Sequence, residues 1–98
     1  MQIEYKNQRM RDICTNASTA RKRYGDRMAA KIHQRIDEIL AIDAVETLVR
    51  CKIGRCHALA GDREGQYAMD LIHPQRLIFI KLDNEVQVVR IEEITDYH

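Results

Sequence analysis

The sequence has few prolines and glycines and no long apolar run, which argues against a disordered chain and against a membrane-spanning helix. Its 98 residues include one proline and four glycines, with 45% apolar and 32% charged residues, so the composition is not that of a disordered chain. No apolar run approaches the roughly 20 residues that a membrane-spanning helix needs. We therefore expect a soluble protein, with residues 1–98 as a single domain. Such a chain holds one modest core, so any active site should be an open surface groove.

Cysteine is too scarce, and present in the wrong number, for a disulfide framework. The chain has three cysteines, and polar and charged residues follow Met1 in place of a secretory signal. These features favour a reducing cytoplasm. The spacing Cys51-x4-Cys56-His57, with Cys14 far away, lacks the paired pattern of zinc sites, so we expect free thiols, no metal and no small-molecule cofactor.

The net charge of +1 argues, taken alone, against a nucleic-acid-binding protein, but it hides an asymmetry along the chain. Residues 6–35 carry nine basic side chains against two acidic ones, Asp12 and Asp26. From Cys56 onward the balance reverses, with four basic residues against eight acidic ones. The basic half is suited to phosphates, or equally to an acidic protein partner.

The first half of the sequence predicts mainly helices. A short strand is expected at residues 3–6 and a short helix at 8–14, and Ser18 suits the N-cap of one long helix that runs to about Ile42. Helical periodicity groups its apolar residues, including Leu40, in one stripe and places polar residues on the opposite side. That cationic side includes Arg23, Arg27 and Lys31. Residues 43–49 can add one or two helical turns.

Four strand-length segments fill the second half, at residues 56–60, 66–72, 76–82 and 86–94. The connectors between them are short and rich in turn residues, so they predict hairpins and an antiparallel meander. The run Leu77-Ile78-Phe79-Ile80 is apolar on both faces, as in a strand covered from both sides. Helices followed by a sheet packed on the long helix predict an α+β fold.

Several side chains in the meander suit ribonuclease chemistry without a metal. Such a reaction needs a base for the 2′-OH, cations for the crowded phosphate and an acid for the leaving oxygen. His57 begins one predicted strand, Arg63 follows in a turn, Arg76 begins the third strand and His98 follows the last. Positions far apart in the sequence can converge on one surface of such a sheet.

Three segments occur together in an order that is more specific than any one of them. They are HALAGDREGQ at residues 57–66, Arg76-Leu77, and Asp96-Tyr97-His98. The second half of the chain thereby resembles HigB-type toxins, the plasmid-maintenance killer branch of the RelE/ParE toxin–antitoxin superfamily. The resemblance implies N-terminal helices on a twisted, mainly antiparallel sheet of four to five strands, with the first strand beside the meander.

The resemblance also implies a function and a role for each residue. It implies a metal-independent endoribonuclease that cleaves mRNA in the ribosome and is silenced by a helix-turn-helix, HigA-like antitoxin. His57 and His98 would then be the acid and base, Asp96 would orient a histidine, and Tyr97 would stack on a base. Arg76 and Arg63 would bear the phosphate charge. In this context the cationic helix side is a candidate surface for RNA or antitoxin.

A second hypothesis is a non-catalytic binding module of the same superfamily, either similar to a gyrase inhibitor or a degenerate toxin that binds an antitoxin or repressor. Family members often carry lysine where this chain has Ala60 and Glu64. The missing cations and the low net charge favour the binding module. The retained His57, Arg76 and terminal Asp96-Tyr97-His98 favour the enzyme.

Overall fold

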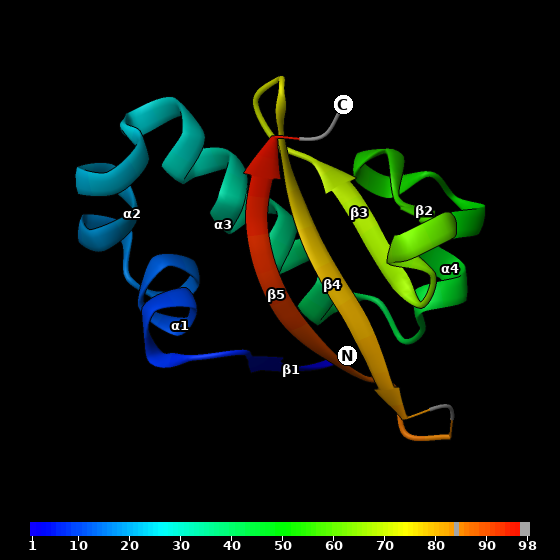
Figure 1. Cartoon of the computed structure of the whole chain (residues 1–98). Coiled ribbons are helices and arrows are strands. Elements are labelled where there is room, and N and C mark those ends of the chain that lie inside the picture. Colours follow the sequence, from blue (N-terminus) through cyan, green and yellow to red (C-terminus); the bar gives the residue numbers. More distant parts are fainter. Residues whose placement is uncertain (84, 97–98) are drawn as a thin grey trace.

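A computed structural model describes residues 1–83 and 85–96 of the chain (Figure 1). Its helices are α1 (Gln8–Thr15), α2 (Ala17–Tyr24), α3 (Asp26–Ala41) and α4 (Val45–Arg50). Its short 3₁₀ segments are η1 (Ile53–Arg55) and η2 (Gly61–Arg63). Its strands are β1 (Gln2–Tyr5), β2 (His57–Ala58), β3 (Gln66–Asp70), β4 (Gln75–Asp83) and β5 (Val88–Asp96). The predicted α+β class is confirmed.

The strands form one sheet in the order β1-β5-β4-β3-β2. Strands β2 to β5 pair antiparallel with their chain neighbours, so the predicted meander is confirmed. Strand β1 runs parallel to β5 at the edge, as the resemblance implied. The predicted first segment of the meander is mostly irregular, because only two of its residues pair with β3 as β2.

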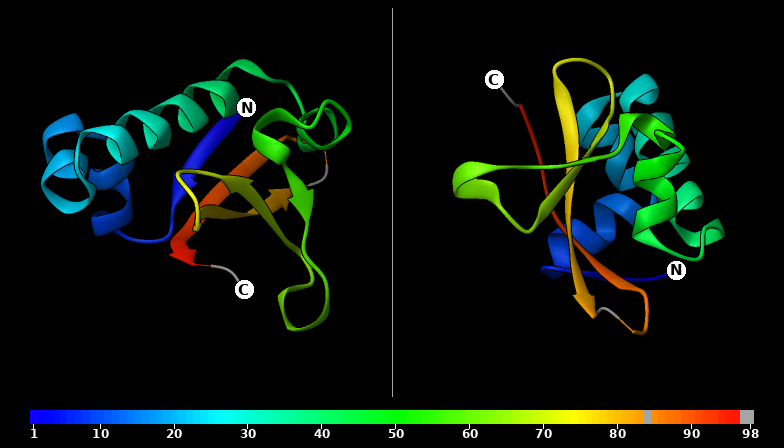
Figure 2. Two further views of the ribbon diagram at one scale, coloured as in Figure 1. Left: turned by 90° about the horizontal axis from the view of Figure 1, so that it is seen from above. Right: turned by 90° about the vertical axis from the view of Figure 1, so that its right-hand side faces the viewer.

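The main core lies between the helices and one face of the sheet (Figure 2). Ile32 and Ile39 of α3 are fully buried, as are Leu77 and Phe79 of β4. On the other face a smaller cluster forms where Leu59 packs with Ala68 and Ile78. The centre of β4 is therefore buried on both faces, which explains its continuous apolar run.

The single long helix predicted from Ser18 is wrong. Asn16 is the N-cap, since its side chain accepts a hydrogen bond from the Thr19 amide at 3.1 Å, and α2 ends at Tyr24. Gly25 then has φ 87° and ψ 171°, a conformation that only glycine adopts without strain, and α3 begins at Asp26. Leu40, expected in the buried stripe, is 54% exposed. Within the described residues, no helix is both long and apolar enough to cross a membrane.

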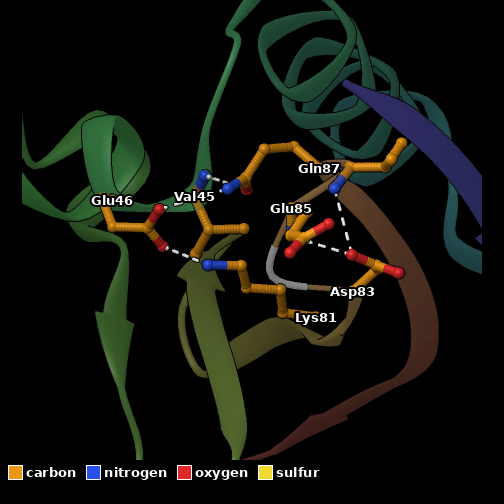
Figure 3. Close-up of polar contacts among 7 residues, drawn as sticks. Val45, Glu46, Lys81, Asp83, Glu85 and Gln87 are labelled. Carbon is orange, nitrogen blue, oxygen red and sulfur yellow. Dashed lines mark hydrogen bonds and ion pairs between the residues drawn. The ribbon is translucent and has the colours of Figure 1, made fainter.

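Helix α4 is attached to the sheet by a polar cluster (Figure 3) and by two buried side chains. Lys81 Nζ of β4 donates to Glu46 Oε2 at 2.7 Å, and Gln87 Nε2 donates to Glu46 Oε1 at 3.3 Å. Gln87 Oε1 in turn accepts from the Val45 amide at 3.2 Å, which satisfies one N–H at the start of the helix. Val45 and Leu48 are fully buried beneath the helix.

We expect burial, and not the polar cluster, to hold α4 in place. Leu48→Ala should lower the free energy of unfolding by about 2–5 kcal/mol, because it leaves a cavity in the core. Lys81→Met should cost less than about 1 kcal/mol, because Glu46 is 57% exposed and water screens the pair. Urea unfolding of both variants measures the difference. Equal losses would show that the ion pair anchors the helix.

The pH dependence of the same pair provides a further check. The hydrogen bond from Lys81 lowers the pKa of Glu46 below its usual value. The contribution of this pair is therefore present above the ordinary carboxyl pKa and is lost as the pH falls through the lowered value. Lys81→Met should accordingly show a smaller loss of stability than the wild type over that acid interval.

Candidate active site

Three of the predicted site residues share the face of the sheet that points away from the main core. His57 pairs with Ala68 across β2 and β3, and Arg76 pairs with Asp70 across β3 and β4. Because alternate residues of a strand point to opposite faces, His57 and Arg76 lie on the face of the small Leu59 cluster. The segment containing η2 projects from this same face and carries Arg63 (Figure 2).

His57 is partly exposed and has a defined orientation. Its Nδ1 lies 2.8 Å from the backbone oxygen of Arg55. A carbonyl oxygen can only accept, so Nδ1 carries the proton and Nε2 is the basic nitrogen of the neutral ring. This arrangement leaves the ring ready to remove a proton through Nε2.

Arg63 is held by neighbours on the sheet. Its guanidinium donates to Gln66 Oε1 and to Glu93 Oε1, each at 2.9 Å. The ion pair with Glu93 ties η2 to β5 across the sheet and offsets the charge of Arg63. A phosphate at this position would have to compete with Glu93, so the ion pair limits Arg63 as a phosphate ligand.

Arg76 belongs to a charged group that the sequence did not reveal. Asp70 Oδ1 lies 3.5 Å from Arg76 Nε, and Asp70 Oδ2 lies 3.3 Å from Arg55 Nε. Arg55 comes from η1, so one carboxylate joins two guanidinium groups from separate elements. Asp70 Oδ1 is buried and accepts no hydrogen bond from the part of the chain that the structure describes. Asp70 thus brings Arg55 and Arg76 together at the end of β3.

The buried side chain of Arg35, on α3, contacts both the backbone of Asp70 and the turn that carries Arg55. Its Nε donates to the backbone oxygen of Asp70 at 2.7 Å, and its Nη1 donates to Glu38 Oε1 at 2.8 Å. Its guanidinium also packs directly under Gly54, where a Cβ atom would lie 2.6 Å from Arg35 Nε. Arg35 is one of the nine basic residues in the half of the chain that is predicted to suit phosphates. It is 9% exposed and acts as an internal support.

The turn at residues 52–55, which packs against Arg35, contains several residues with a left-handed backbone. Lys52 and Arg55 have φ of 53° and 55°, and Gly54 between them has φ of 58°. Left-handed conformations are uncommon for residues with a Cβ atom and persist where the surroundings fix them. Here the Arg35 guanidinium and the His57 ring hold the turn from two sides. No local sequence signal marks this geometry beyond the glycine itself.

The remaining predicted residues lie elsewhere. Asp96 ends β5 opposite Gln75, one position beyond the pair of Arg76 and Thr95, so strand alternation places it on the other face from Arg76. Tyr97 and His98 lie outside the described residues, and their assigned roles stay predictions.

The cationic helix surface, defined as Arg23, Arg27 and Lys31, is separate from the His57 face. Figure 1 shows α2 and β2 at opposite ends of the molecule. Arg23 and Arg27 are exposed, and the Arg23 guanidinium lies 5.8 Å from the centre of the Tyr24 ring. Lys31 Nζ donates to Gln34 Oε1 at 2.9 Å. Arg23 lies on α2 and Arg27 and Lys31 lie on α3, so the predicted single helix face is divided between two helices. These residues do not contribute to the group around Asp70.

Two of the three thiols are buried. Cys14 and Cys56 are buried, and burial raises the pKa of each to about 12, so both stay protonated near neutral pH. Cys51 is exposed. Across residues 1–83 and 85–96 there is no cluster of three or more His, Cys, Asp or Glu side chains that would hold a metal ion.

Comparison with known proteins identifies the fold. No protein-family model matches this sequence, and no curated protein sequence matches it significantly. Among solved structures, a YoeB/ParE toxin from Agrobacterium tumefaciens aligns over 100% of both chains with a TM-score of 0.64 and 16% identity. The YoeB-YefM complex from Staphylococcus aureus aligns over 100% of this chain and 97% of the other, with a TM-score of 0.64 and 22% identity. This chain has the fold of these toxins.

A third structure extends the likeness. YafQ from Escherichia coli aligns over 97% of this chain and 91% of its own, with a TM-score of 0.64 and 21% identity. The alignment to these toxin folds covers nearly the whole chain. It includes α1 to α3, which contain none of the sequence motifs.

The contact between Gly54 and Arg35 generates a test of how the site is built. Gly54→Ala should lower the free energy of unfolding, because its backbone has a left-handed φ and the added Cβ meets the Arg35 guanidinium. A residue with a Cβ atom in this left-handed conformation costs about 1–3 kcal/mol of stability by itself. Gly61→Ala is the matched control, since Gly61 has φ of 64° but no atom within 4 Å of its Cβ position. Chemical unfolding of both should show the larger loss for Gly54→Ala. Equal losses would show that Arg35 adapts without cost.

Proposed function

We propose that this chain is a HigB-like toxin of a type II toxin–antitoxin system and that it cleaves mRNA on the ribosome. The observation that carries the proposal is the shared placement of His57, Arg63 and Arg76 on the sheet face that the helices leave open. The toxin fold of the structural neighbours supports the same class of function. An open face suits a polymer substrate better than a deep cavity would.

The proposed reaction is an attack of the 2′-OH on the adjacent phosphate. His57 Nε2 removes the 2′-OH proton while the O2′–P bond forms, and Arg76 offsets the negative charge that develops on the phosphate. The P–O5′ bond then breaks, and an acid protonates the 5′-oxygen. The products are a 2′,3′-cyclic phosphate, or the 3′-phosphate after its hydrolysis, and a 5′-hydroxyl. This scheme uses no metal and no small-molecule cofactor.

The terminal residues complete the proposal by resemblance. His98 takes the part of the acid and Tyr97 stacks on a base. Because Asp96 lies on the other sheet face from His57, the histidine that it would orient is His98. The general acid could also be His57 with the roles exchanged, because proton transfer by either histidine satisfies the chemistry. The orientation of the His57 ring by the Arg55 carbonyl favours the base role for His57.

The proposed partners are the ribosome with its mRNA and a helix-turn-helix, HigA-like antitoxin, and the proposed site of action is the cytoplasm. A complex is known for one neighbour, YoeB with YefM from S. aureus. The exposed surface of Arg23, Arg27 and Lys31 is proposed to contact ribosomal RNA or the antitoxin. Its position at the far end from His57 leaves the reactive face clear.

A second candidate is a non-catalytic binding module with the same fold. The ion pair of Arg63 with Glu93 favours it, because that pair offsets a cation on the very face that would bind RNA. Ala60 and Glu64 add no cation beside it. In this alternative the face binds a protein partner and His57 has no chemical role.

A primer-extension assay on mRNA in translating ribosomes separates the two candidates. The wild type should cut at the codon in the decoding site, and His57→Ala and His98→Ala should each lower the cutting rate by about 100-fold or more, as loss of an acid or base does. His33→Gln is the control, because His33 lies on α3 with Nε2 3.2 Å from the Ile13 oxygen. No cutting by a folded wild-type protein would favour the binding module.

A further inference from the structure

We propose that Arg55 binds a phosphodiester of single-stranded RNA next to the one that is cleaved. The inference rests on the proposed ribonuclease function and adds to it a substrate-positioning residue that the sequence motifs do not contain. Arg55 is also the residue whose backbone oxygen orients His57, so one residue would place both the base and the substrate.

The first observation is that Arg55 separates two hollows of the surface. One hollow, of about 400 Å³, is lined by Val49, Lys52, Arg55, Cys56 and His57. The other, of about 250 Å³, is lined by Arg55, Asp70, Leu71, His73, Pro74, Gln75 and Arg76. Arg55 is the single residue common to both linings. An RNA strand that runs from the base His57 to the cation Arg76 therefore passes Arg55.

The second observation is the charge of the second hollow. Arg55 and Arg76 contact the two carboxylate oxygens of Asp70, so guanidinium groups line this hollow. The Arg55 guanidinium is 77% exposed and gives the hollow a positively charged donor for a phosphate.

The third observation is that the Arg55 guanidinium has N–H donors beyond the one that contacts Asp70. Its side chain is 77% exposed, and within the described part of the chain its recorded contact is the one from Nε to Asp70 Oδ2 at 3.3 Å. A guanidinium has five N–H donors in a planar fork that matches two phosphate oxygens. The Nη groups of Arg55 can thus receive a phosphate while Nε keeps its contact with Asp70.

The fourth observation is that the Arg55 backbone is fixed before any substrate binds. Its amide donates to the Lys52 oxygen at 3.0 Å, its oxygen lies 2.8 Å from the His57 ring, and Gly54 rests on the Arg35 guanidinium. Arg55 also has a left-handed φ of 55°, which is uncommon for a residue with a Cβ atom. Residues with such backbone strain cluster at functional sites.

Binding of an RNA hexamer with 2′-O-methyl groups tests the inference, because this probe cannot be cleaved. Fluorescence anisotropy over a series of salt concentrations gives both the affinity and its salt dependence. Arg55→Ala should weaken binding about tenfold. It should also reduce the slope of log K against log salt by about 0.7, the contribution of one contact to a single strand.

Two variants control for charge and for folding. Arg55→Lys keeps the charge but lacks the planar fork, so it should retain the slope and lose part of the affinity. Arg9→Ala removes the same charge from the exposed side of α1 and should change neither quantity. An unchanged affinity and slope in Arg55→Ala, or a wild type that does not bind the hexamer at low salt, would overturn the inference.

The same variants keep this inference distinct from the proposed function. If the wild type binds the hexamer through Arg55 but cuts no mRNA on ribosomes, the binding site stands and the ribonuclease function fails. If the wild type cuts mRNA and Arg55→Ala matches it in affinity, slope and KM, the function stands and the role of Arg55 fails.

Discussion

The buried guanidinium of Arg35 is the interaction on which the candidate site depends. A charge inside a protein is tolerated only when hydrogen bonds and an opposite charge compensate for the water that it loses. Arg35 obtains these from Glu38 on its own helix and from the Asp70 oxygen at the end of β3. Because the second bond crosses from helix to sheet, it fixes the distance between α3 and the end of β3.

This support explains why an otherwise strained turn can be kept. Gly54 allows the turn to approach the guanidinium, and the approach leaves Arg55 above Asp70 with a left-handed backbone. The Arg55 carbonyl then meets the His57 ring as β2 begins. Arg35, Gly54, Arg55 and His57 thus form one continuous series of contacts.

The sequence predicted the parts of the fold that local patterns determine. Short connectors between apolar segments were sufficient for the meander, because so few residues can only form hairpins. The break at Gly25 was not predicted, because the apolar period continues through it and only the backbone conformation changes. The site was predicted in part. His57 and Arg76 came from the motif, whereas Arg55 and Asp70 were missed, because their contact depends on a turn that is held by a residue 20 positions away.

The two cationic surfaces of the molecule must act independently. The protein is 35 Å along its longest axis, and the Arg23 surface and the His57 face lie toward opposite ends. At physiological ionic strength exposed charges are screened within about 8 Å, so Arg23, Arg27 and Lys31 cannot strengthen the phosphate binding that is proposed at Arg55. Arg23, Arg27 and Lys31 can therefore attract only a partner that contacts them directly. The low net charge is therefore a poor guide to the proposed RNA binding, which depends on the local charge of the exposed Arg55.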